Sequence, residues 1–222
     1  MAREEFVAKA AVFGSPERLA ELVERERDGV SHDEFMNRPE NQPLKDGWQA
    51  ATFSLGYQRV VGKPVDVRLS SSEQFPDFKL KVEGVEHDFE NVMIVTKALG
   101  KEYKGDTRTG PIKTPVPTSV PPFDPAPLLA GIQRKIDKHY AGDVNLLVYV
   151  NYKGGNVAEA EIVREVQRVC GDEFESVWLL VYGRETGSSG APVNMVLCAR
   201  PSPKLEAPVG WQIVPTIAEP MR

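Results

Sequence analysis

The chain has 222 residues, of which 41% are hydrophobic and 27% are charged, and its formal net charge is −5. The acidic balance argues against a protein that coats nucleic acid, because backbone affinity comes from neutralising phosphates, but it leaves room for an enzyme with a local basic patch. The 2 cysteines form no CxxC motif and the 3 histidines lie far apart, which disfavours disulfide frameworks and zinc sites. No apolar run approaches the roughly 20 residues that span a bilayer, so we expect a soluble, cytoplasmic protein without a membrane partner.

Residues 1–45 are predicted to form an N-terminal helical extension. Residues 1–14 are interpreted as containing a short strand. A helix is expected to begin at Ser15-Pro16 and to end near Gly29, because serine caps helix N-termini and proline is tolerated at the first helical position. Residues 30–45 are rich in asparagine and proline and are interpreted as a loop.

Residues 46–200 are predicted to form the main domain. Trp48, Ala51 and Leu55 recur at helical spacing, which predicts a helix over residues 47–61. This predicted helix contains no acidic residue. Residues 65–69 alternate apolar and polar side chains and are expected to form a strand.

The next stretch, residues 75–95, is predicted to be a β-hairpin around which the main domain is organised. Glu83-Gly84 supplies the tight turn, so Val82 faces Val85. Stepping outward along both strands pairs Lys79 with Asp88, Lys81 with Glu86, and Asp77 with Glu90.

The pairing of Asp77 with Glu90 requires an explanation, because like charges directly opposite each other destabilise a sheet. A divalent cation between the two carboxylates is one explanation, and oxygen ligands of this kind suit Mg²⁺. After Glu90 the strand becomes apolar on both faces, so this carboxylate stands where the strand enters the core. The alternative is an ordinary amphipathic hairpin with Asp77 in a turn and Glu90 solvated.

Pro76-Asp77 followed by Glu90-Asn91-Val92 resembles the motif of the PD-(D/E)XK nuclease superfamily, in which Pro-Asp heads one strand and Glu-x-Lys lies in the next. The chain departs from the motif at Val92, which stands where the lysine is expected, and in the absence of an acid from the helix over 47–61. The resemblance covers residues 46–200. It implies a restriction-endonuclease-like core whose two motif carboxylates hold Mg²⁺ or Mn²⁺ for phosphodiester hydrolysis.

Lys135 is the first candidate for a catalytic lysine that has moved to another element. A helix is predicted over residues 127–140, and Leu128, Ile132 and Ile136 place Lys135 inside its apolar stripe. A lysine in that position either extends past the core to solvent or reaches an acidic site. The catalytic set implied by the resemblance is therefore Asp77, Glu90 and Lys135, of which the two acids are the metal ligands.

A basic segment follows the hairpin and is the predicted nucleic-acid-binding element. It has an excess of positive charge in an otherwise acidic chain, and we expect it either to hold phosphates near the metal or to be a solvated connection. Its later part, residues 111–127, contains 7 prolines and excludes a central strand or helix. The residues assigned to nucleic-acid binding are Lys97, Lys101, Lys104 and Arg108.

The remaining pattern predicts an α/β fold with a mixed β-sheet flanked by helices. Strands are expected at 145–151, 176–182 and 193–199, with a helix over 158–169, and residues 201–222 are interpreted as an irregular tail.

Three functions are compatible with the sequence. The first is a metal-dependent nuclease acting on nucleic acid, with DNA the expected partner. The second is a catalytically inactive nuclease-like module that binds nucleic acid or a protein, and the third is an unrelated interaction protein. The sequence also leaves a homodimer open.

Overall fold

The computed structural model describes most of the chain. The described residues are 2–70, 75–95, 103–109, 125–140, 143–151, 159–184, 192–207, 210 and 212–214.

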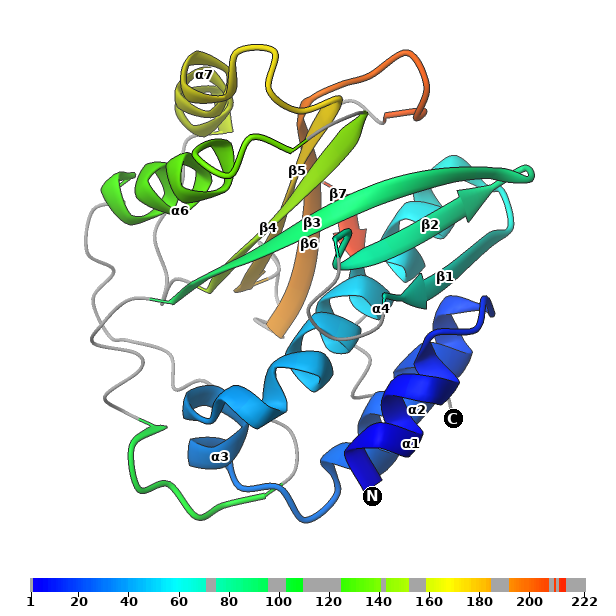
Figure 1. Ribbon diagram of the computed structural model, residues 1–222. Helices are drawn as coiled ribbons and strands as arrows, with labels where there is room; N and C mark the ends of the chain where they lie inside the picture. Colours follow the sequence, from blue (N-terminus) through cyan, green and yellow to red (C-terminus); the bar gives the residue numbers. More distant parts are fainter. Residues whose placement is uncertain are drawn as a thin grey trace.

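A mixed seven-stranded sheet with strand order β1-β2-β3-β4-β5-β6-β7 forms the centre of the molecule (Figure 1). The central pairs β3–β4 and β4–β5 are parallel, whereas β1–β2, β2–β3, β5–β6 and β6–β7 are antiparallel. The predicted α/β class with a mixed, helix-flanked sheet is therefore confirmed. The strands are β1 (Val65–Leu69), β2 (Phe78–Val82), β3 (Val85–Val95), β4 (Val144–Asn151), β5 (Ser176–Arg184), β6 (Pro192–Arg200) and β7 (Gln212–Val214).

The predicted register of the β2–β3 hairpin is confirmed from Val82↔Val85 outward to Phe78↔Phe89. Glu83 and Gly84 both have positive φ, at 49° and 85°, as expected for the two central residues of a tight hairpin turn. The Lys79 ammonium lies 2.8 Å from Asp88 and 3.6 Å from Glu86. The expected ion pair of Glu86 is thus made with Lys79 instead of Lys81, whose Nζ lies 5.3 Å from the centre of the Phe13 ring.

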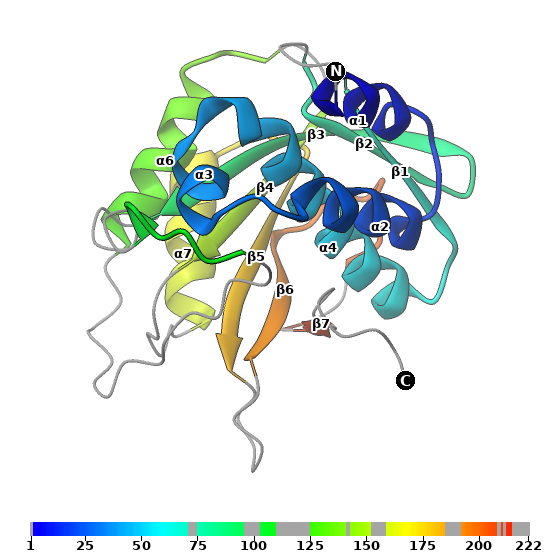
Figure 2. The ribbon, with the colours of Figure 1, turned by 90° about the horizontal axis from the view of Figure 1, so that it is seen from below.

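Helices cover both faces of the sheet (Figures 1 and 2). On one face α4 (Gln42–Val61) packs with α2 (Pro16–Arg27) and α1 (Ala2–Ala10), and Phe53 of α4 lies against Phe89 and Trp178. On the other face α6 (Ala126–Ile136) and α7 (Glu159–Cys170) cover alternate residues of β3, β4 and β5. Successive residues of β3 therefore point to opposite faces of the sheet and contact different helices. This alternation determines on which face each polar side chain of β3 lies.

The N-terminal region is more helical than predicted. Residues 2–10 form α1 and not a strand, because Phe6 and Ala10 lie one helical turn apart and are both buried against α2 and α4. The expected helix from Ser15-Pro16 is confirmed as α2, with the Ser15 hydroxyl accepting from Arg18 N–H. These helices share one hydrophobic core with α4 and β1.

The predicted loop over 30–45 was wrong. It contains α3 (His32–Asn37), the short 3₁₀ helix η1 (Pro39–Asn41) and the first turn of α4. Ser31 and Glu34 form a capping box that fixes the start of α3, and Pro43 lies within the first turn of α4, where proline is tolerated. As a consequence, α4 begins five residues before the predicted helix start at 47 and includes Asp46.

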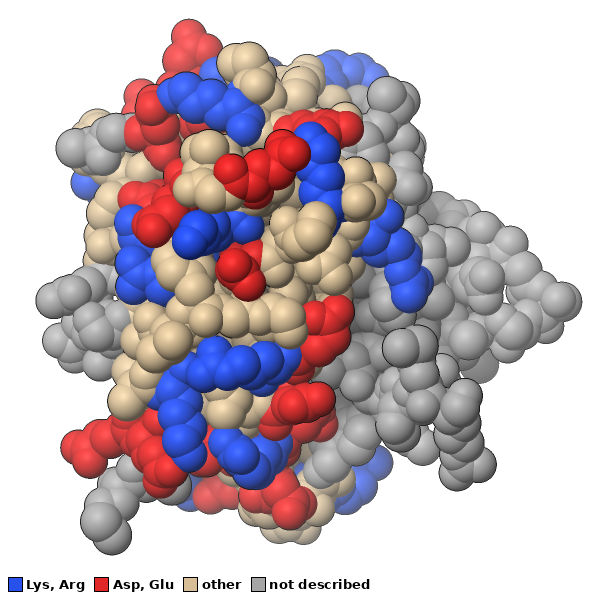
Figure 3. Space-filling model, turned by 90° about the vertical axis from the view of Figure 1, so that its right-hand side faces the viewer, with Lys and Arg blue, Asp and Glu red and all other residues tan. Residues whose placement is uncertain are grey.

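The strands predicted at 65–69, 145–151, 176–182 and 193–199 correspond to β1, β4, β5 and β6, and the helix over 158–169 corresponds to α7. The tail is not wholly irregular, because Gln212–Val214 pairs with β6 as β7. No helix within the described residues is both long enough and apolar enough to span a membrane. On the face shown in Figure 3, acidic and basic side chains of the described residues are interspersed.

Candidate functional site

Asp77 and Glu90 lie close together where β2 begins, and the part of the sheet that carries these two carboxylates is called the acidic edge below. Asp77 directly precedes β2, and its Oδ2 accepts a 2.7 Å hydrogen bond from the backbone N–H of Asn91 on β3. Glu90, one residue earlier in β3, lies on the face covered by α6 and is only 3% exposed. The hairpin ladder ends at Phe78↔Phe89, so Asp77 and Glu90 each lie one residue beyond its last pair.

Lys135 of α6 reaches both carboxylates. Its Nζ lies 2.5 Å from Oε2 of Glu90 and 3.3 Å from Oδ2 of Asp77. Leu128 and Ile132 of the same helix are fully buried against the sheet, so the apolar stripe of α6 aims Lys135 at the hairpin and away from solvent. The lysine predicted to have moved from the Val92 position therefore contacts both predicted acids.

The two carboxylates near Lys135 favour the charged form of its side chain. Burial lowers the pKa of the Lys135 ammonium, but the charges of Asp77 and Glu90 and the hydrogen bonds to them together raise it by more. The net pKa of Lys135 is raised, so the side chain stays protonated near neutral pH. An ammonium between two carboxylates explains how the sheet tolerates two acids on one edge.

Tyr140 is a fourth member of the site. Its hydroxyl donates a 2.7 Å hydrogen bond to Oε2 of Glu90, the same oxygen that Lys135 contacts. Burial, followed by this hydrogen bond, raises the pKa of Tyr140, so the hydroxyl remains a donor. The Tyr140 ring also stacks on Phe75, with ring centroids 5.0 Å apart.

Asp46 approaches the same edge from α4, on the opposite face of the sheet from Lys135. Its Oδ1 accepts a 2.8 Å hydrogen bond from Gln42 and a 3.4 Å contact from the side-chain amide of Asn91. Asn91 therefore connects the two acids, since its backbone binds Asp77 and its side chain approaches Asp46.

Asp46 has a strongly perturbed acidity. Burial raises the pKa of Asp46 to about 7, and the nearby negative charge of Asp77 adds to this effect. A carboxyl that titrates near neutral pH beside other acids is a feature of functional sites, although buried structural groups show it as well.

Sequence reasoning missed Asp46, Asn91 and Tyr140. The predicted helix begins at residue 47 and so excludes Asp46, whereas Pro43 in the first turn of α4 is the signal for an earlier start. Tyr140 follows the end of α6, and His139 between them has a positive φ of 49°, so helical spacing from Lys135 does not predict its position.

The four basic residues assigned to nucleic-acid binding are only partly described. Lys97 and Lys101 lie outside the described residues, whereas Lys104 and Arg108 are exposed. The Arg108 guanidinium pairs with the Asp106 carboxylate at 2.7 Å, and this pairing is the main cause of the lowered pKa of Asp106.

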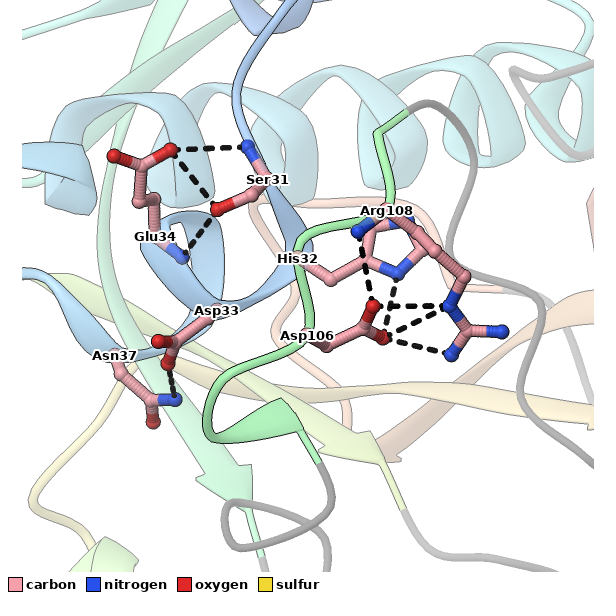
Figure 4. A network of polar contacts seen from close by, with 7 residues as sticks. All are labelled: Ser31, His32, Asp33, Glu34, Asn37, Asp106 and Arg108. Atoms are coloured by element: carbon pink, nitrogen blue, oxygen red, sulfur yellow. Dashed lines mark hydrogen bonds and ion pairs between the residues drawn. The ribbon is translucent and has the colours of Figure 1, made fainter.

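The segment 103–109 is fixed to the start of α3 (Figure 4). The backbone N–H groups of His32 and Asp33 donate to the carbonyls of Arg108 and Asp106, and His32 Nδ1 lies 3.2 Å from Oδ2 of Asp106. Glu34 caps the start of α3 through its contacts with Ser31. These contacts explain the polar residues of α3 as structural.

The donor set at the acidic edge fits a hard cation with few protein ligands. Among the described residues, no group of three or more His, Cys, Asp or Glu side chains is arranged to hold a metal ion. Asp77 and Glu90 supply two carboxylates, which is the number that Mg²⁺ commonly takes from a protein while it keeps waters and substrate phosphates.

No family model, curated protein or solved structure matches this chain.

Proposed function

We propose that the protein is a metal-dependent nuclease-like hydrolase that cleaves phosphodiester bonds of nucleic acid, with DNA the expected partner. The observation that supports this proposal is the contact of one ammonium, Lys135, with two carboxylates from neighbouring strands, Asp77 and Glu90. These residue types are the parts that phosphodiester hydrolysis needs: acids to hold a cation and a lysine to orient water or to stabilise developing negative charge.

Asp77 and Glu90 would hold Mg²⁺ or Mn²⁺, and the ion would polarise the scissile phosphate and activate water. The described contacts of Lys135 and Tyr140 use Oδ2 of Asp77 and Oε2 of Glu90. They leave the second oxygen of each carboxylate to a cation. The Asp77 side chain is 30% exposed and that of Glu90 only 4%, so substrate would approach from the Asp77 side.

The experiment is a cleavage assay with single-stranded and duplex DNA and with RNA, in Mg²⁺, Mn²⁺ or EDTA. We expect cleavage by the wild type only with metal, and a loss of at least two orders of magnitude in Asp77→Asn and Glu90→Gln. Asp88→Asn is the matched control, because Asp88 lies on the same strand but pairs with Lys79. Equal rates in all four proteins, or no cleavage by the wild type, would refute the proposal.

The alternative is a catalytically inactive module of the same fold that binds nucleic acid or a protein. It is favoured by the contact of Lys135 with both carboxylates, since the ammonium offsets part of their negative charge without any metal. Calorimetric titration with Mg²⁺ and Mn²⁺ separates the two functions. Heat of binding that disappears in Asp77→Asn supports the hydrolase, whereas its absence from the wild type supports the binding module.

A further inference from the structure

Phe75 is the only aromatic side chain among Phe, Tyr and Trp that is exposed within the described residues. It is 43% exposed, although its ring stacks almost parallel on Tyr140, with an interplanar angle of 19°. The stack explains how one side of the ring is packed. It does not explain why so much apolar surface is left in water.

The position of this ring pair connects it to the acidic edge. Phe75 precedes Asp77 by two residues, and the hydroxyl of its stacking partner Tyr140 donates to Glu90. The Phe75 ring contacts Tyr140, and Tyr140 contacts Glu90, so a single side chain separates the Phe75 ring from the Glu90 carboxylate.

A positive charge accompanies the rings. The Nζ of Lys138, an exposed residue, lies 5.9 Å from the centre of the Tyr140 ring. Aromatic rings beside a cation are the combination with which proteins bind unpaired nucleotides, since bases stack on the rings and phosphates pair with the charge.

We propose that Phe75, supported by Tyr140, is a stacking platform for an unpaired base, and that the nucleic acid bound at this site is single-stranded. An exposed ring face can take a base only when that base is not already stacked and paired within a duplex. This inference rests on the proposed function for the role of the neighbouring carboxylates, and it adds the substrate class.

The test measures binding of fluorescein-labelled oligothymidylate, and of its duplex with oligoadenylate, by fluorescence anisotropy in EDTA, where no cleavage occurs. We expect the wild type to prefer the single strand and Phe75→Leu to lose about tenfold or more of that affinity. Duplex affinity should be unchanged. Phe75→Trp should retain the affinity, and its tryptophan fluorescence should be quenched more by the single strand than that of the wild type, which has 3 tryptophans. Val85→Leu, at the exposed turn end of the hairpin, is the control for apolar surface changes.

Three outcomes overturn the platform: equal single-strand affinity in the wild type and Phe75→Leu, tryptophan fluorescence in Phe75→Trp that is quenched no more than in the wild type, or a wild type that binds no single strand. Failure of the proposed function is distinguishable, because a protein that binds oligothymidylate through Phe75 but cleaves nothing in Mg²⁺ or Mn²⁺ would retain the platform and lose the hydrolase.

Discussion

At the scale of single residues, the site consists of carboxylates that accept hydrogen bonds from more than one donor each. Glu90 Oε2 accepts from both Lys135 and Tyr140, and Asp77 Oδ2 accepts from Lys135 and from the Asn91 backbone. Two carboxylates on one edge are thereby stabilised by donors from β3, from α6 and from the residues that follow α6. Asp46 is different, because Gln42 and Asn91 donate to it and no ammonium of the described residues contacts it.

Asp46 should make the protein less stable as pH rises. Its pKa is raised to about 7 in the folded protein, chiefly by burial and then by the charge of Asp77, whereas the unfolded chain has the ordinary value of about 4. Between these two values the folded state binds the extra proton, so stability is highest below pH 4 with respect to this group and falls until pH passes about 7.

Asp46→Asn keeps the hydrogen-bond acceptor and removes the titration. We expect it to match the wild type near pH 4 and to exceed its stability by a few kcal/mol, to order of magnitude, at pH 8. Urea unfolding across this pH range measures the difference. Asp66→Asn, at an exposed position of β1, is the matched control and should show no such trend. If the difference in stability between Asp46→Asn and the wild type does not grow with pH, the predicted cost of ionising the buried Asp46 carboxyl is wrong.

At the scale of elements, the hairpin turn determines the register of the site. Glu83 has φ 49° and Gly84 has φ 85°, and glutamate is poorly suited to a positive φ, whereas Asn-Gly is the preferred pair for such turns. The tight turn therefore forms although glutamate is unfavourable at one of its two central positions.

Glu83→Asn should stabilise the protein by about 0.5–1 kcal/mol, since asparagine adopts a positive φ more readily than glutamate. The substitution also removes an exposed ion pair with Lys63, which we expect to matter little. Glu206→Asn removes the other carboxylate partner of Lys63 without touching the turn and is the control. Guanidinium unfolding of the three proteins provides the comparison, and a destabilised Glu83→Asn would refute the turn argument.

At the scale of the whole molecule, the features that could be predicted from the sequence are those that follow from local alternation or local repetition of residue types. The hairpin register followed from Glu83-Gly84, and the mixed sheet followed from the order of strands and helices. α1 was mistaken for a strand because nine residues with only a few apolar positions do not distinguish the two periods, and its burial against α2 and α4 decided the outcome. Its helical form is therefore a result of tertiary packing.

The candidate site was predictable in part for the same reason. Asp77 and Glu90 are neighbours because of local pairing, and Lys135 stood out as a charge in an apolar stripe. Asp46 and Tyr140 depend on where a helix begins and on how the chain turns after α6, which no periodic pattern specifies. Long-range packing of α4 and α6 on opposite faces of the sheet brings these residues to one edge (Figure 1).

The central claim is that Lys135 supplies the ammonium that Val92 cannot supply. Lys135→Met leaves two carboxylates without their cation, so folding of each variant must be checked by circular dichroism, with Lys135→Arg as the charge-retaining variant. Arg134→Met, at an exposed neighbouring position of α6, is the matched control.

The most direct measurement is the rate of Mg²⁺-dependent cleavage of single-stranded DNA by folded Lys135→Met. We predict a loss of at least two orders of magnitude relative to the wild type, partial activity in Lys135→Arg, and an unchanged rate in Arg134→Met. A folded Lys135→Met that cleaves at the wild-type rate would contradict the assignment of Lys135 to the active site.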